Sequence, residues 1–168
     1  MRSLRTFVLA AIISIAVGGI ASADVKLPAV IGDNMVLQQG AELPFWGWAE
    51  PGEGVTVTIG GKSVSATTAA DGRWFVRVPS VTKFGVVEVV VAGKNSLTLK
   101  NVLIGDVWVC SGQSNMQWRV LESTGAKEEI PAAKHPTIRL FKVERQTALE
   151  PQTDVEGKWV ECSPESIG

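Results

Sequence analysis

Short β-type runs, separated by glycine-rich turns, dominate the chain from residue 27 to residue 101. At 55–59 and 73–78, apolar or β-branched residues alternate with polar ones, so that one face of each run is apolar. The Gly-Gly pair at 60–61 and the Asp-Gly pair at 71–72 have the composition of tight hairpin turns. Such runs, recurring about every eight to twelve residues, predict an antiparallel β-sandwich.

The first residues of the chain, 1–23, have the composition of a secretory signal peptide. Arg2 and Arg5 precede an apolar core at 7–20, which ends in an Ala-Ser-Ala cleavage site. The core is shorter than the ~20 residues that a membrane span needs, and an uncleaved anchor is the alternative interpretation. We therefore expect an exported protein, periplasmic or extracellular, that starts at Asp24.

The mature chain has about 145 residues, enough for one sizeable core or two small ones. It carries 14 Lys and Arg against 17 Asp and Glu, a net charge of −3. This balance favours neither nucleic acid nor a stable membrane association as a partner, and it leaves the oligomeric state open. No residue cluster has metal-ligand spacing and no glycine-rich loop has a phosphate-binding pattern, so the sequence predicts no cofactor.

The character of the chain changes at Val102. Residues 102–110 are almost continuously apolar, which predicts a strand covered on both faces of an α/β sheet. We therefore expect a β-sandwich domain at 24–101, followed at 102–168 by the first, incomplete part of an α/β domain. Further predicted elements are a helix at 116–121, a loop at 127–131, a strand at 138–143, an extended segment at 159–162 and the start of a helix at 164–166.

Cysteine adds an ambiguity to this second part. Cys110 and Cys162 both remain after signal cleavage, in a compartment that permits disulfides. They form either one bridge or two free thiols, since the sequence does not show how close their Cα atoms lie. The predicted strand buries Cys110, which favours a free thiol as much as a bridge.

A serine turn directly follows the predicted strand. Ser114 lies two residues after Gly112, at the carboxyl end of the strand, where open α/β sheets gather their ligands. The glycine permits a tight turn, and the serine hydroxyl would attack an ester carbonyl while its own N–H helps to hold the oxyanion. Gln113 and Asn115 either support the substrate or stabilise the turn. The alternative is a Ser or Asn helix cap, and the Gly-x-Ser-x-Gly elbow is absent because Met116 occupies its second glycine position.

Residues 106–118 resemble the nucleophile block of the sialate O-acetylesterase family, which belongs to the SGNH (GDSL-like) carbohydrate esterases. Other segments that resemble this family, in the same order, are 32–38, 46–53, 138–141, 157–159 and 162–165. The resemblance implies a β-sandwich followed by an SGNH-type α/β hydrolase domain, matched only over an amino-terminal portion. It also implies that Ser114 forms an acetyl-enzyme during removal of O-acetyl groups from a carbohydrate.

The resemblance supplies no base for the serine. The family's oxyanion glycine, oxyanion asparagine and Asp-x-x-His pair match no position of this chain. His135 is the single histidine, and Ala132 stands where its aspartate would be needed, so we interpret it as a surface-loop residue. Serine without a base is a weak nucleophile, so this chain alone is expected to be inactive.

Two alternatives to this function stay open. One is an acetyl xylan esterase, which shares a similar serine block. The other is a non-catalytic β-sandwich fragment that binds carbohydrate or has a structural role. Trp46, Trp48 and Trp74 form either a sugar-stacking platform or, as aromatic residues at alternating strand positions more often do, part of the core.

We expect the part after Val102 to be less stable than the sandwich, because a strand without neighbours leaves apolar surface uncovered.

Overall fold

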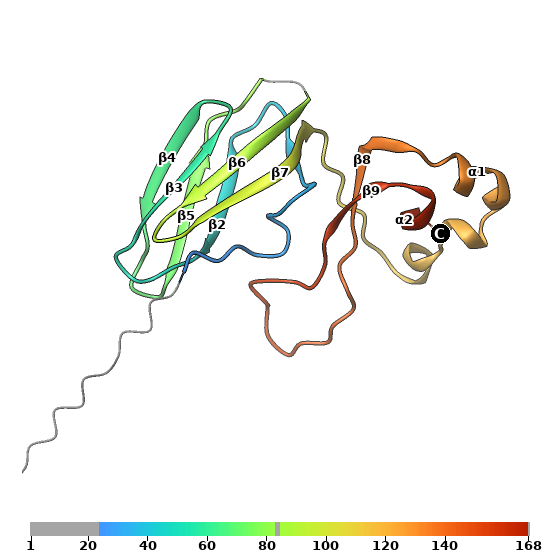
Figure 1. The fold of residues 1–168 in the computed structure, drawn as a ribbon. Coiled ribbons are helices and arrows are strands. Elements are labelled where there is room, and N and C mark those ends of the chain that lie inside the picture. The colour runs from blue at the N-terminus through green and yellow to red at the C-terminus, as the bar shows by residue number, and fades with distance from the viewer. Residues whose placement is uncertain (1–23, 83–84, 168) are drawn as a thin grey trace, which may run out of the picture.

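The structure is a computed structural model that describes residues 24–82 and 85–167. The predicted signal peptide, residues 1–23, lies outside the described residues. Figure 1 shows a body of packed strands next to a smaller part that carries the last two strands and the helices. In the described part of the chain, no helix is both long and apolar enough to cross a membrane.

Seven strands form the larger body as two sheets. The first sheet has the order β1-β7-β6-β3-β4, and the second pairs β2 with β5. The strands are β1 (Val36–Gln38), β2 (Leu43–Trp48), β3 (Gly54–Ile59), β4 (Lys62–Thr67), β5 (Arg73–Val78), β6 (Val86–Ala92) and β7 (Ser96–Gly105). The expectation of a purely antiparallel sandwich is wrong at one place, because β1 lies parallel to β7. The two strands are far apart in sequence, so no hairpin forces them to run in opposite directions.

The alternation of residue types builds the core that the two sheets share. In β3, Val55, Val57 and Ile59 are buried while the residues between them are more exposed. Buried residues of the other strands join them in one cluster, among them Leu43, Phe45, Val76, Val78, Val87, Val89 and Val91. Each such side chain contributes about 1.5–3 kcal/mol when it is fully buried, so this cluster is the main stabilising element of the body.

The β3–β4 hairpin has the predicted Gly-Gly turn. Ile59 pairs with Lys62, which leaves two loop residues, and both Gly60 and Gly61 have positive φ. Two consecutive left-handed residues give the turn a twist that matches the strands, and glycine adopts this backbone without steric cost.

A bulge interrupts the pairing of β6 with β7. Val87 pairs with Val102 and Val89 with Leu99, so β7 has one extra residue between these pairs. Asn101 lies there with a left-handed backbone, φ 57°. Strand β7 continues to Gly105 and thus crosses the expected domain boundary between residues 101 and 102.

The expected buried strand at 102–110 is wrong beyond Gly105. Residues 106–110 form no strand and are all exposed, including Trp108 (84%), Val109 (91%) and Cys110. Their apolar composition was the basis of the prediction, but among the described residues no strand pairs with this segment.

The smaller part contains short helices and one strand pair. Its elements are the 3₁₀ helices η1 (Ser114–Gln117) and η2 (Val120–Glu122), the helices α1 (Ala126–Ala132) and α2 (Pro164–Ile167), and the strands β8 (His135–Phe141) and β9 (Trp159–Cys162). The single helix expected at 116–121 is therefore two shorter turns, and the loop expected at 127–131 is helical. Glu128 and Glu129 favour that helix, because acidic side chains in the first turn complement the helix dipole. Strand β9 and the start of α2 lie where the sequence predicts them.

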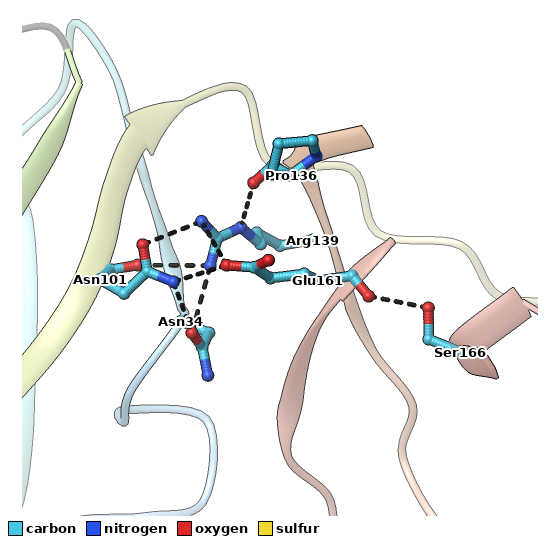
Figure 2. Close-up of polar contacts among 6 residues, drawn as sticks. All are labelled: Asn34, Asn101, Pro136, Arg139, Glu161 and Ser166. Atoms are coloured by element: carbon cyan, nitrogen blue, oxygen red, sulfur yellow. Dashed lines mark hydrogen bonds and ion pairs between the residues drawn. The ribbon is translucent and has the colours of Figure 1, made fainter. Parts of the chain in front are cut away.

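Arg139 of β8 attaches the smaller part to the bulge of β7 (Figure 2). Its side chain is only 2% exposed, and its guanidinium donates to the Asn34 and Asn101 side-chain oxygens at 3.3 and 3.1 Å. It also forms an ion pair with Glu161 of β9 at 3.4 Å. The indole of Trp159 donates to the Val30 carbonyl at 2.8 Å, so β8 and β9 both contact the larger body.

Candidate functional site

Ser114 is the first residue of η1, directly after an irregular segment. The turn is closed by two backbone hydrogen bonds, from Met116 N to Gln113 O at 2.9 Å and from Trp118 N to Asn115 O at 3.2 Å. The N-cap residue is Gln113, and its side chain makes no capping hydrogen bond. Ser114 is therefore not the cap of this helix, so the alternative interpretation of this serine as a helix cap does not hold.

The polar groups of this turn face solvent. Gly112, Gln113, Ser114 and Asn115 are all exposed. Within the described residues, the Ser114 hydroxyl makes no hydrogen bond, and no acceptor binds the Ser114 backbone N–H. The structure thus brings the four predicted site residues into one open turn, and their catalytic or supporting roles stay predictions.

Gly112 is needed because the Met116 side chain lies close to it, and not because its backbone is left-handed. A Cβ atom at this position would lie 2.6 Å from Cγ of Met116, well inside the normal contact distance. The Met116 side chain therefore lies directly against the glycine, in the space that a Cβ atom would need. Sequence reasoning identified the glycine but not this contact, because nothing in the motif shows the direction of the methionine side chain.

Hydrogen bonds from β1 hold the start of the serine segment. The Asp106 carboxylate accepts from Gln39 Nε2 at 3.1 Å, and Gln38 Oε1 accepts from the Val107 N–H at 2.9 Å. Gln38 is the last residue of β1 and pairs with Gly105, and Gln39 follows it, so the parallel pairing brings the ends of β1 and β7 together. Sequence reasoning did not identify Gln38 and Gln39 as supports of the site, since the parallel pairing was not predicted.

Downstream of the serine, Arg119 and Glu122 stabilise the second 3₁₀ turn. The Arg119 N–H donates to Glu122 Oε2 at 3.1 Å, and the Arg119 guanidinium donates to Oε1 at 3.3 Å. The backbone hydrogen bond from Arg119 and then its side-chain hydrogen bond lower the pKa of Glu122 below its ordinary value of 4.5. Both favour the ionised carboxylate.

His135 does not pair with Ser114. It is the exposed first residue of β8, where its Cα partner is Cys162, and no hydrogen bond joins it to the serine among the described residues. It thus lies on the surface at a strand end.

Both cysteines are free, Cys162 buried and Cys110 exposed, so the disulfide alternative is not formed in this structure. Within residues 24–82 and 85–167, no group of three or more His, Cys, Asp or Glu side chains lies close enough to hold a metal ion.

Comparison with known proteins connects this geometry to one group of enzymes. No family model matches the chain. Sialate O-acetylesterases of Homo sapiens and Pongo abelii are each 33% identical to it over 159 residues. The match covers 85% of this chain and 30% of each relative, so the chain spans less than a third of their length.

A solved structure agrees with this relationship. A carbohydrate acetylesterase from Xanthomonas citri superposes with a TM-score of 0.83 and 32% sequence identity, over 86% of this chain and 34% of that one. The partial coverage fits the expectation of an amino-terminal portion. The chain is therefore homologous to the sialate O-acetylesterases, over a portion that spans about 30% of their length.

Proposed function

We propose that this chain carries the nucleophile of a serine esterase that removes O-acetyl groups from carbohydrate. The observation that carries the proposal is the exposed Ser114 turn, in which neither the hydroxyl nor the backbone N–H has a partner among the described residues. It lies in a chain 33% identical to sialate O-acetylesterases. An open hydroxyl beside an unused N–H suits attack on an ester carbonyl.

The reaction divides into two steps. Ser114 Oγ adds to the acetyl carbonyl carbon and loses its proton to a base, while the Ser114 N–H donates to the oxyanion. The tetrahedral species expels the sugar oxygen, which takes up a proton, and an acetyl ester remains on Ser114. Water then attacks this ester, releases acetate and restores the hydroxyl.

The described residues supply the nucleophile and no base for it. His135 is the only histidine of the sequence, and it forms no hydrogen bond with Ser114. Loss of the base from a catalytic triad lowers the rate by about four to six orders of magnitude. We therefore propose that this chain alone releases acetate very slowly, and that the full rate needs a histidine supplied by further sequence.

Acetate release tests both parts of the proposal. The substrates are O-acetylated sialic acid and acetylated xylan, and the proteins are this chain and the same chain extended by any coding sequence that follows it in the source genome. We expect activity in the extended form only. Ser114→Ala should abolish it, whereas Ser111→Ala, at another exposed serine of the same segment, should not.

Each result decides a separate point. An extended form without Ser114-dependent activity would contradict the esterase proposal. Equal activity of both forms would contradict the need for further sequence. The ratio of rates on the two substrates separates a sialate esterase from an acetyl xylan esterase.

Export is a further part of the proposal, based on the composition of residues 1–23. In a bacterial host, we expect the mature protein in the periplasm or the medium, with Asp24 as its first residue. Amino-terminal sequencing of fractionated cells tests this, and a cytoplasmic protein that retains Met1 would contradict it.

A further inference from the structure

A hollow of about 560 Å³ lies against the second sheet, away from the serine turn. It is lined mainly by residues of β2 and β5 and of the loop before β5, among them Trp46, Trp48, Asp71, Arg73 and Phe75. No residue of the segment 106–118 lines it. Whatever it binds, it binds outside the proposed catalytic turn.

The strand register explains why aromatic side chains gather there. Trp46 pairs with Phe75 and Trp48 with Arg73, so these four side chains share the face of the sheet opposite the core. Phe75 is 50% exposed, and the Arg77 guanidinium lies 5.2 Å from its ring centre. Trp46 is partly buried and also packs against the core cluster, whereas Trp48 and Phe75 are not among the residues packed against it.

Trp74 also lines the hollow, but it belongs to the core cluster and not to this outer face. It is 3% exposed, and a Cβ atom on the neighbouring Gly47 would lie 3.0 Å from its ring. The glycine therefore lets the Trp74 ring pack closely against β2. Of the two alternatives for the three tryptophans, the core position holds for Trp74, while Trp46 and Trp48 are half-buried on the face that they share with Phe75.

The rim of the hollow is polar and its charges are balanced. Asp71 accepts a hydrogen bond from the Arg73 N–H at 3.1 Å and lies 3.9 Å from the Arg73 guanidinium. Both side chains stay more than half exposed. Thr67 and Thr153 add hydroxyl groups, the latter from the loop between β8 and β9. Such a rim offers hydrogen-bond donors and acceptors without a strong net charge.

We propose that this hollow binds pyranose rings of a neutral glycan, as a subsite separate from Ser114. The C–H face of a sugar ring packs on an aromatic ring, and its hydroxyl groups bond to planar polar side chains at the rim. The choice of a glycan rests on the proposed esterase function, because the substrate proposed there is a carbohydrate. The balanced Asp71–Arg73 pair favours a neutral sugar over an acidic one.

Calorimetric titration of the full chain tests the subsite. The probes are cellohexaose, which is neutral and has no acetyl group, and 3′-sialyllactose, which is acidic. We expect cellohexaose to bind, and Phe75→Ala and Trp48→Ala each to weaken it about tenfold through loss of the stacking surface. Trp108→Ala is the matched control, because Trp108 is 84% exposed and lies outside the hollow.

The variants also separate the subsite from the proposed catalysis. Ser114→Ala should bind cellohexaose as the parent chain does, since neither binding nor this probe involves an ester. Trp48→Phe keeps an aromatic ring and should retain most of the affinity, which distinguishes lost stacking from a folding defect. Three results would each overturn the subsite: no binding of cellohexaose at millimolar concentration, equal loss in Trp108→Ala, or tighter binding of 3′-sialyllactose.

Discussion

At the scale of single residues, the serine turn depends on the absence of a side chain at Gly112. Because an added Cβ would meet Met116 Cγ at 2.6 Å, Gly112→Ala must displace the methionine or the turn. We expect Ser114-dependent acetate release in the extended form to fall about tenfold or more, since a displacement of about 1 Å costs roughly that much or more in a positioned nucleophile.

The control for this change is Gly105→Ala, whose Cβ would find an ordinary contact of 3.5 Å with Val36. A double change, Gly112→Ala with Met116→Ala, should restore part of the activity because it removes the obstructing atom. Activity of Gly112→Ala equal to that of the parent would show that the turn tolerates the added carbon and that the packing has no catalytic consequence.

The sequence allowed the serine turn to be predicted, but not the contacts that hold it. Ser114 and Gly112 belong to a recognisable motif, and the structure places both in one exposed turn. Gln38 and Gln39 lie almost 70 positions away from Asp106. Their contact follows from a parallel strand pair, which local residue patterns do not reveal.

At the scale of elements, Arg139 is the contact that holds the strand pair β8–β9 on the sandwich. Its buried guanidinium satisfies the oxygens of Asn34, Asn101 and Glu161 together, and Arg139→Ala would leave these groups without their shared donor. We expect the free energy of unfolding of the smaller part to fall by about 2–4 kcal/mol.

Urea unfolding followed by the 19F NMR signal of Trp159, in protein labelled with 5-fluorotryptophan, checks this prediction, because the five other tryptophans would add to a fluorescence signal. Arg145→Ala, at an exposed arginine, is the control and should change the midpoint little. A midpoint for Arg139→Ala equal to that of the control would mean that the strand pair is held by other contacts, such as the Trp159 indole.

The second 3₁₀ turn should respond to acid. The pKa of Glu122 is lowered by the hydrogen bonds from Arg119, so its stabilising effect is fully present above its ordinary pKa of 4.5 and is lost as the pH falls through the lower folded value. We expect the Arg119 amide signal in an NMR titration to move with a midpoint below 4.5. In Glu122→Gln this movement should vanish, and a midpoint above 4.5 in the parent chain would contradict the hydrogen-bond assignment.

Elements with strict alternation were predicted well, and elements defined by composition were not. Strands β5 and β9 have the predicted bounds, because turns or polar residues mark their ends. Residues 106–110 are apolar yet form no strand, since a strand also needs a partner that composition does not provide. Helix α1 was missed because Pro131 suggested a loop, although proline here stands near the end of the helix and interrupts little.

At the scale of the whole molecule, stability is divided unequally. The buried cluster lies in the larger body, whereas Trp108, Val109 and Trp118 of the serine segment are each more than 60% exposed. We expect native-state hydrogen exchange to be slowest at amides of β3 and β6 and fastest within 107–118, by about three orders of magnitude or more. Similar protection in both regions would contradict this division.

Stability is greater in the larger body because that part buries the apolar cluster, whereas the serine segment leaves its apolar residues exposed. This difference suits the proposed chemistry. A rigid sandwich fixes β7 and, through Gln38 and Gln39, the start of the serine segment. The proposed esterase function depends most on whether Ser114 itself becomes acylated.

Mass spectrometry of the acyl-enzyme tests this claim most directly. The extended form is mixed with p-nitrophenyl acetate, quenched in acid within milliseconds and digested, with Ser114→Ala and Ser111→Ala treated in parallel. We expect one acetyl group on the peptide that contains Ser114, present in the parent and in Ser111→Ala and absent in Ser114→Ala. Ester turnover with no acetyl group on Ser114, undiminished in Ser114→Ala, would contradict this expectation.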